Sequence, residues 1–404
     1  MKDKFLSFSE GGFTLPQEEV LELKSENKKL SIGIPKEVLL QEKRIGLVPD
    51  AVNLLTNNGH HVIVQSGVGD VINFSDKEYS ECGALIVQTA REVYQAADII
   101  LKVSPPTHEE IRFMKKNQTL ISALQLKIQN PDFFKELMKK KITAIAYDYI
   151  QDEDGIFPVV RSMSEIAGNA SVLIAAECLS NLNNGKGILM GGVAGGSTTD
   201  IVILGAGTVG EFAARSAIGL GASVKIFDNS LYKLRRVQNK LNARIDTNMI
   251  NPKALEKSVR RADVVIGAIR SRDGRTPCII SEDMVKLMKP GSVIVDVSID
   301  RGGCVETSEV TSHTSPTFIK HGVIHYCVPN IASRVSRTAS YALSNVFTPL
   351  LLEMGEGGGL EKMMHSQSGI KNGIYMYKGI LTSQVLGETF DLPYKDIDLL
   401  MAAI

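Results

Sequence analysis

One segment near the middle of the chain joins a glycine-rich turn to a strand-like run on one side and a helix-like run on the other. It reads DIVILGAGTVGEFAARSAIGLGASVKIFD, residues 200–228, with Gly205, Gly207 and Gly210 spaced as Gly-x-Gly-x-x-Gly. Gly205 permits a tight turn, Gly207 lets the backbone approach a pyrophosphate, and Gly210 lets the helix pack close to the sheet. The free N–H groups and positive dipole end of the helix attract phosphate. This context predicts a dinucleotide-binding βαβ unit.

The end of the second strand in this segment indicates which dinucleotide is bound. Asp228 is placed to accept hydrogen bonds from the adenosine ribose hydroxyls, and a carboxylate there would repel a 2′-phosphate. We therefore expect NAD rather than NADP as the cofactor. Lys233 and Arg235 follow closely and weaken this preference slightly, and Lys233 is itself a candidate contact to the cofactor.

Short apolar runs alternate with helix-like segments along most of the chain. Strand-like runs such as DIILKVS, QTLISAL and ITAIAYDYI lie in the first part, and a second series begins near residue 200. Strands separated by about 10–15 helical residues indicate βαβ units and a mostly parallel sheet. The expected fold class is α/β, with two Rossmann-like doubly wound domains linked by long helices. The predicted divisions are an N-terminal extension (1–29), a discontinuous substrate domain (30–158 plus 337–404) and a dinucleotide-binding domain (159–336).

Composition excludes several other classes of protein. The 404 residues include 45 Lys and Arg against 45 Asp and Glu, so the net charge offers no attraction to nucleic acid or to an acidic membrane surface. No apolar run approaches the roughly 18 residues that span a bilayer, and the N-terminus lacks a signal-peptide core. The five cysteines are far apart and show no zinc spacing. We expect a cytoplasmic protein with free thiols and no metal.

Several motifs around the glycine turn are more specific than the turn itself. They are IGIPKE, KRIGLVP, DIILKV, MSEIAG, MGGVAG, VDVSIDRGGC and YCVPNI. In these motifs the chain resembles alanine dehydrogenase and the related NAD-binding subunit of proton-translocating transhydrogenase, from about residue 30 to about residue 350. The resemblance implies two Rossmann-like domains with a cleft between them. It also implies a homo-oligomer, because the family commonly forms hexamers and sometimes dimers.

Two basic residues are candidates for binding a carboxylate substrate. Lys102 ends the run DIILK, and the carboxyl ends of strands in an α/β sheet face the crevice where ligands bind. Arg44, in QEKRIGLVP, matches the family arginine that binds the substrate carboxylate, and a guanidinium suits this planar group. By the same resemblance, Lys102 would contact the carboxylate and the oxo oxygen and polarise the carbonyl.

Further polar residues match family positions near the reacting atoms. Asp300 ends the run GSVIVDVSID at an expected strand tip, and it matches the aspartate that activates water and shuttles a proton; Asp296, inside the same run, is the competing candidate. Asn330 in YCVPN matches a residue that lines the nicotinamide and substrate pocket. Met163 and Ser164 match positions beside the cofactor.

One position departs from the family pattern. Aligned without gaps from DIILKV, the histidine that alanine dehydrogenases carry falls on Gln125, at the expected end of the strand TLISAL. A histidine titrates near neutral pH, whereas an amide can bind an oxygen but cannot transfer a net proton. Gln125 is therefore a candidate catalytic-site residue with a binding role. Proton traffic would fall on Asp300, Lys102 or water.

The resemblance implies reversible, NAD-dependent oxidative deamination of L-alanine to pyruvate and ammonia. Because of Gln125, the chain is compatible with an altered alanine dehydrogenase, with an enzyme for another 2-amino acid, or with an NAD-binding protein without efficient turnover. Two alternatives are a transhydrogenase-like NAD-binding module and a saccharopine- or lysine-type dehydrogenase. Asp300 and the lack of a characteristic Arg, Gln and Asp loop before MSEIAG count against the first. The second would want a Lys/His acid–base pair that is not evident. The expected partners are small amino and 2-oxo acids, with no nucleic acid and no membrane.

Overall fold

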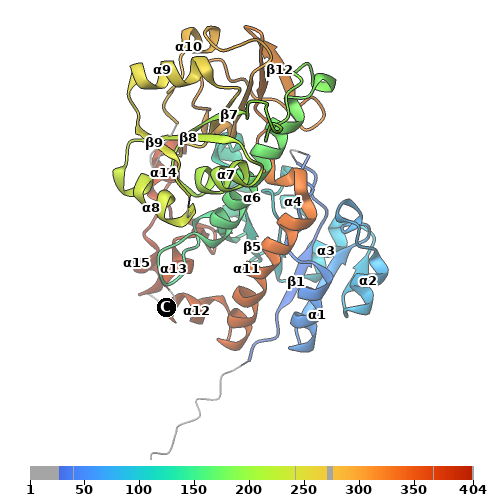
Figure 1. Ribbon diagram of the computed structural model, residues 1–404. Coiled ribbons are helices and arrows are strands. Elements are labelled where there is room, and N and C mark those ends of the chain that lie inside the picture. The colour runs from blue at the N-terminus through green and yellow to red at the C-terminus, as the bar shows by residue number, and fades with distance from the viewer. Residues whose placement is uncertain (1–26, 40, 242, 271–275, 367, 403–404) are drawn as a thin grey trace, which may run out of the picture.

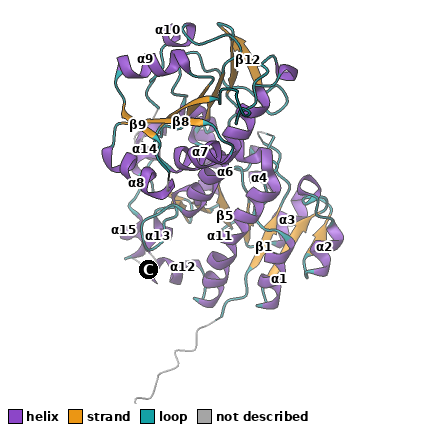
Figure 2. Ribbon diagram, viewed as in Figure 1, coloured by secondary structure: helices purple, strands orange, loops and turns teal. Residues whose placement is uncertain are grey.

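The computed structural model describes residues 27–404, apart from positions 40, 242, 271–275, 367 and 403–404 (Figure 1). Most of the predicted N-terminal extension therefore lies outside the described residues. The described chain forms two sheets, each flanked by helices (Figure 2). In Figure 1 the second sheet lies at the top of the view, with β7 and β8 in yellow-green, and the first lies below it.

The first sheet has eight strands in the order β15-β14-β6-β5-β4-β1-β2-β3. β1 to β6 pair in parallel, whereas β14 pairs antiparallel with both β6 and β15. The strand order changes direction between β1 and β4, which is the place where ligands bind in open α/β sheets. The strands of this sheet are β1 (Ser31–Ile34), β2 (His61–Gln65), β3 (Leu85–Val87), β4 (Ile99–Leu101), β5 (Thr119–Ser122), β6 (Thr143–Ala146), β14 (Ile374–Tyr377) and β15 (Ile380–Leu381).

The second sheet has seven strands in the order β12-β13-β11-β10-β7-β8-β9. All its pairs are parallel except β12 with β13. Its order changes direction between β7 and β10, directly at the glycine turn. The strands are β7 (Asp200–Leu204), β8 (Ser223–Asp228), β9 (Asp246–Met249), β10 (Val264–Gly267), β11 (Val293–Asp296), β12 (Thr317–Lys320) and β13 (Val323–Tyr326).

Helices cover both sheets and connect them. They are α1 (Pro49–Asn57), α2 (Asp76–Glu81), α3 (Ala90–Ala96), α4 (His108–Phe113), α5 (Pro131–Lys139), α6 (Pro158–Cys178), α7 (Thr208–Gly219), α8 (Leu231–Leu241), α9 (Pro252–Arg261), α10 (Glu282–Lys286), α11 (Ser336–Glu356), α12 (Leu360–Ser366), α13 (Ser368–Lys371), α14 (Gln384–Phe390) and α15 (Ile397–Met401). The long helices α6 and α11 carry the chain from the first sheet to the second and back, and Figure 1 shows both where the two halves meet.

Each sheet buries apolar side chains on both faces, as a parallel sheet requires. Along β4, Ile99 and Leu101 belong to one core and Ile100 to the core on the opposite face. Along β7, Ile201 and Ile203 face one core, and the residues between and after them face another. This alternation follows from the two-residue repeat of a strand. The two-domain α/β class expected from the sequence is confirmed, whereas the predicted residue boundaries stay predictions.

The strand end predicted at Asp300 is wrong. The strand whose end was expected at Gln125 ends three residues earlier, at Ser122. β11 ends at Asp296, so Asp300 lies not at a strand tip but in the 3₁₀ turn Val297–Arg301. The Asp296 carboxylate accepts hydrogen bonds from the backbone N–H groups of Ser298 (3.0 Å) and Cys304 (2.9 Å), which turns the chain away from the sheet. β5 ends at Ser122, and Gln125 follows with left-handed backbone angles, φ 45° and ψ 60°.

Candidate functional site

The glycine turn has the geometry that its spacing predicts. β7 ends at Leu204 and α7 begins at Thr208. Gly205 has φ +105°, and a Cβ on Gly210 would lie 1.9 Å from the carbonyl oxygen of Gly205. A Cβ on Gly207 would meet nothing within 4 Å, so the backbone here is open to a ligand. No side chain caps the start of α7, so its first N–H groups point to that open side.

The acidic residue beyond the turn, Asp228, lies at the same site and contacts the turn directly. Asp228 is 8 % exposed, and its two oxygens accept hydrogen bonds from the N–H groups of Ala206 (2.8 Å) and Ser230 (2.7 Å). Each oxygen keeps a further lone pair with which to accept a ribose hydroxyl. Lys233 is exposed near the start of α8. The residues present therefore fit a nicotinamide dinucleotide.

One cation at this turn is not among the sequence candidates. Arg236, one helical turn beyond Lys233, donates from Nη2 to the carbonyl oxygen of Ala206 at 3.0 Å. Its Nε is buried without a hydrogen-bond partner. The helical repeat could have identified it, because a residue three positions along α8 shares the face of Lys233. Neither Lys233 nor Arg235 makes a comparable contact with the turn among the hydrogen bonds of the described residues.

In the first sheet, Lys102 lies directly after β4, beside the change in strand direction. It is 1 % exposed, and its Nζ lies 2.5 Å from Glu110 Oε1 and 3.7 Å from Glu37 Oε2. Glu37 also accepts hydrogen bonds from the N–H groups of Val103 (2.6 Å) and Ser104 (3.2 Å). Burial raises the pKa of Glu37 to about 7, although the Lys102 charge and the Val103 N–H act to lower it. Two buried carboxylates thus hold the Lys102 ammonium in place.

Arg44 is buried in the long connection between β1 and α1, where Glu42 holds it. Arg44 Nε and Nη2 donate to the two oxygens of Glu42 at 2.8 and 2.7 Å, and Nη1 donates to Met163 Sδ at 3.2 Å. Burial acts to raise the pKa of Glu42, but the Arg44 charge and hydrogen bonds outweigh it and lower the pKa. Serine hydroxyls of α11 fix the following backbone, because Ser340 and Ser344 accept the N–H groups of Ile45 and Val48, each at 2.9 Å.

Glu42 also joins the two halves of the molecule. Asn330 Nδ2 donates to Glu42 Oε2 at 2.6 Å, and Ser333 Oγ donates to Glu42 Oε1 at 3.2 Å. The backbone N–H of Asn330 donates to Asp300 Oδ1 at 3.1 Å. Asn330 itself has a left-handed backbone, with φ 58°. One glutamate that the sequence analysis missed thus brings Arg44 and Asn330 together, and Asn330 in turn binds Asp300 through its backbone N–H.

The remaining predicted residues lie around this junction. Gln125 follows β5, and its Oε1 is buried without a hydrogen-bond partner among the described residues. Ser164 lies on α6 next to Met163, the residue that contacts Arg44. Gly168, in the same MSEIAG motif, lets α6 approach α7, since a Cβ there would lie 2.5 Å from the carbonyl oxygen of Val209.

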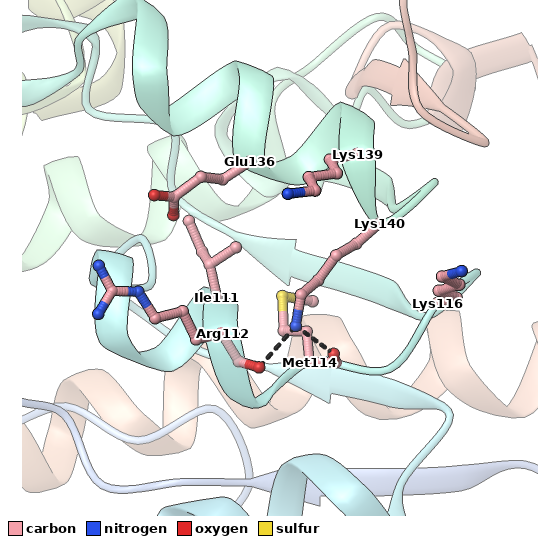
Figure 3. Close-up of a pocket in the computed structure, with 7 residues that line it drawn as sticks. All are labelled: Ile111, Arg112, Met114, Lys116, Glu136, Lys139 and Lys140. Atoms are coloured by element: carbon pink, nitrogen blue, oxygen red, sulfur yellow. Dashed lines mark hydrogen bonds between the residues drawn. The ribbon is translucent and has the colours of Figure 1, made fainter.

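Two cavities differ in their relation to these residues. One, of about 260 Å³, is lined by Glu37, Glu42 and Arg44 at the carboxyl end of β1. Another, of about 430 Å³, lies between α4 and α5 near the amino ends of β5 and β6, and Figure 3 shows its lining. There Lys140 donates to the carbonyl oxygens of Arg112 and Met114, each at 2.6 Å. Only the first cavity adjoins the candidate site.

Family models match nearly the whole described chain. The model of the alanine dehydrogenase/PNT N-terminal domain matches residues 33–167, and that of the C-terminal domain matches residues 171–384. The chain belongs to the alanine dehydrogenase/PNT family. Its place in this family agrees with the two sheets and with the glycine turn between β7 and α7.

Individual relatives of the alanine dehydrogenase/PNT family agree with this assignment. Alanine dehydrogenase from Mycolicibacterium smegmatis is 39% identical over 365 residues, which are 90% of this chain and 98% of that protein. Alanine dehydrogenase from Methanococcus maripaludis is 39% identical over 364 residues, 90% of this chain and 97% of that protein. A solved L-alanine dehydrogenase superposes with a TM-score of 0.84 at 35% identity, covering 89% of this chain and 99% of that one. A transhydrogenase from Sinorhizobium meliloti, at 24% identity and a TM-score of 0.74, shares the fold.

Membrane spans and metal sites are two other features that the described residues do not show. Among the described residues, no helix is both long and apolar enough to cross a bilayer. Within the same part of the chain, no three His, Cys, Asp or Glu side chains are grouped so that they could hold a metal ion.

Proposed function

We propose that the protein is an NAD-dependent alanine dehydrogenase, which converts L-alanine, water and NAD⁺ reversibly to pyruvate, ammonium, NADH and a proton. The proposal rests on the link of Arg44 to Asn330 through Glu42, and of Asn330 to Asp300, at the junction of a dinucleotide-binding half and a half that carries Lys102. The similarity to alanine dehydrogenases over about nine-tenths of the chain supports it.

Arg44 has the donors that a substrate carboxylate needs. Glu42 uses the Nε–H and one Nη2–H of the guanidinium, which leaves both Nη1 hydrogens and one Nη2 hydrogen. One Nη1 hydrogen points to the Met163 sulfur, a weak acceptor that a carboxylate would displace. On the edge of the guanidinium away from Nε, one Nη1 hydrogen and the second Nη2 hydrogen lie parallel, and such a pair binds a carboxylate through two hydrogen bonds. Glu42 thus orients the substrate-binding edge of Arg44.

Lys102 and the aspartate of the other half would act at the reacting carbon. The Lys102 ammonium, fixed by Glu110 and Glu37, would stabilise negative charge on the oxygen of pyruvate or of its hydrated precursor. Asp300 is exposed and is joined to the nicotinamide-side residue Asn330, so it would orient the attacking water. The Gln125 amide would donate to the same substrate oxygen, because an amide binds without titrating.

The cofactor would be held by the glycine turn, Asp228 and residues of α8. When bound, the dinucleotide supplies the hydride acceptor. The turn presents its N–H groups to the pyrophosphate, and Asp228 accepts the ribose hydroxyls. Asp228 would repel a 2′-phosphate, which favours NAD over NADP, and Lys233 would contribute a cation at the cofactor's edge. Ser164 and Asn330 would line the nicotinamide end.

NADH production tests this proposal. Purified protein with NAD and L-alanine at alkaline pH should produce NADH steadily, and Arg44→Lys should raise the KM for alanine far more than the KM for NAD. Arg44→Lys keeps the positive charge opposite Glu42, so it disturbs the buried ion pair less than a neutral side chain would, but it removes the two parallel donors of the guanidinium. Arg161→Lys is a matched control, because Arg161 forms an exposed pair with Glu165 on α6. No NADH from alanine or from a panel of other amino acids, lysine and saccharopine included, would reject the assignment.

The cellular setting belongs to the same proposal. We expect a cytoplasmic homo-oligomer, either a hexamer or a dimer, whose five cysteines stay reduced. Cys82, Cys178, Cys304 and Cys327 form no disulfide in the structure, which agrees with a reducing compartment. Light scattering coupled to size exclusion measures the assembly, and a monomer at micromolar concentration would contradict this part.

A further inference from the structure

A carboxyl group that the sequence analysis did not single out follows β6, the parallel neighbour of the strand that precedes Gln125. Asp148 is the second residue of the 3₁₀ turn Tyr147–Tyr149, directly after β6. β5 and β6 are parallel neighbours, with Ser122 paired to Ala146. Asp148 therefore follows Ala146 by two residues, and Gln125 follows Ser122 by three, at the same carboxyl edge of the sheet. This is the edge on which Lys102 follows β4.

The turn that carries Asp148 is fixed to the substrate side of the site. The hydroxyl of Tyr147, which is buried, donates to the carbonyl oxygen of Val103 at 2.6 Å. Val103 directly follows Lys102, and its N–H donates to Glu37. The backbone on either side of Asp148 thus keeps a defined position relative to Lys102.

Charges from both halves of the molecule act on Asp148. They are those of Arg44 in the first half and of Arg270, Arg301 and Asp300 in the second. Burial raises the pKa of Asp148 to about 6, with the three arginines acting against this rise and Asp300 adding to it. Asp148 is thus a half-buried carboxyl group whose pKa responds both to the predicted carboxylate-binding arginine and to the predicted water-orienting aspartate.

We propose that Asp148 is the catalytic acid–base residue of the deamination, where it supplies the proton transfer that Gln125 cannot supply. The inference rests on the proposed function. After hydride loss the substrate is a protonated imine, and a water oxygen forms a bond to its C2 while the C=N electron pair moves to nitrogen. Asp148 takes the proton that this water loses. It then returns the proton to the amine nitrogen. As the C–N bond breaks and ammonia leaves, the Asp148 carboxylate takes the proton of the C2–OH, which becomes the carbonyl of pyruvate, and this proton then passes to the departing ammonia to give ammonium.

The other titratable groups at the site are less suited to this step. The Lys102 ammonium is held by Glu110 and Glu37, so it serves best as a fixed positive charge. Glu37 uses one oxygen for the Val103 N–H and the other for the Ser104 N–H. Asp300 is exposed and accepts the backbone N–H of Asn330, so it serves best to orient the attacking water.

The rates of deamination and of reductive amination should depend on pH in opposite ways, and this difference identifies the residue. In the deamination direction Asp148 must begin as the carboxylate, so kcat/KM for alanine should fall as the pH drops through about 6. In reductive amination the same group must begin protonated, so that rate should fall as the pH rises through the same value. Asp148→Asn should abolish both limbs and lower kcat about 10²–10⁴-fold, with the affinity for NAD unchanged. Asp148→Glu should retain part of the rate and the limb.

Two further variants separate this proposal from its competitors. Gln125→His added to Asp148→Asn should restore part of kcat, with a new limb near the pKa of a histidine. Glu37→Gln should leave the limb near pH 6 in place. The proposal is overturned if Asp148→Asn keeps both limbs, if it keeps kcat within about threefold of wild type, or if Glu37→Gln removes the limb instead. A wild-type protein that binds NAD but oxidises no amino acid would instead refute the proposed function, on which this inference depends.

Discussion

Glu42→Gln isolates the residue that joins the two halves of the site. The Glu42 side chain is fully buried, and its two oxygens accept hydrogen bonds from Arg44, Asn330 and Ser333, along with the N–H groups of residues 43 and 44. Glutamine has nearly the same shape, so it creates no cavity. However, it turns one oxygen into an NH₂ group that faces other donors, and it leaves the Arg44 guanidinium buried without its hydrogen-bonded carboxylate.

The expected cost is large because the ion pair is buried. Removing one partner of such a pair costs about 3–5 kcal/mol, since the remaining charge stays desolvated. Denaturant unfolding should therefore show a large drop in midpoint with little change in slope. Because Glu42 also orients Arg44, the KM for alanine should rise by about tenfold or more, where each factor of ten corresponds to about 1.4 kcal/mol.

A surface glutamate provides the matched control. Glu361 pairs with Lys378 at 2.6 Å, but the two side chains are 53% and 49% exposed. Glu361→Gln should cost about 0–1 kcal/mol and leave KM unchanged. If Glu42→Gln costs no more than Glu361→Gln and leaves the KM for alanine unaltered, then Glu42 neither stabilises the junction nor orients Arg44, and the reasoning is refuted.

Three further predictions concern the cofactor turn and the fold. Gly210→Ala should abolish NAD binding in a titration, because its Cβ would lie 1.9 Å from the Gly205 carbonyl oxygen; unchanged affinity would contradict the predicted close packing. Asp228→Asn should raise the KM for NAD and lower the KM for NADP, and a preference that does not move would exclude Asp228 as the selector. Burial lowers the pKa of His60, whose Nδ1 accepts the Leu30 N–H at 3.2 Å. Its stabilisation should be complete above the unfolded value near 6.5 and be lost as the pH falls through the lower folded value. Unfolding midpoints of wild type and His60→Asn should therefore converge at acid pH, and a constant difference would contradict this.

The sequence predicted the parts of the site that depend on local pattern. The glycine spacing placed the turn after β7, because each glycine there answers a backbone requirement of the turn itself. The apolar run before Lys102 placed this residue at a strand end, because parallel strands present their carboxyl ends along one edge. The two-domain class followed from the alternation of strands and helices.

The parts that the sequence did not predict depend on contacts between distant segments. Glu42 and Asn330 are 288 positions apart, and nothing near either residue indicates that their side chains meet. Glu110 has the pattern of the glutamate that ends a capping box begun by Thr107, and it fills that role, but its second oxygen also binds Lys102. Asp300 was placed on a strand because its run is apolar, whereas the Asp296 side chain ends that strand by accepting backbone N–H groups.

The transfer of deuterium from L-alanine labelled at C2 tests the central claim most directly. The protein is mixed with NAD and this substrate, and the products are examined by mass spectrometry and NMR. The account predicts that the deuterium appears at C4 of the reduced nicotinamide, with one pyruvate formed for each NADH. NAD binding without deuterium transfer from alanine would contradict it, and transfer from a different labelled amino acid would reassign the substrate.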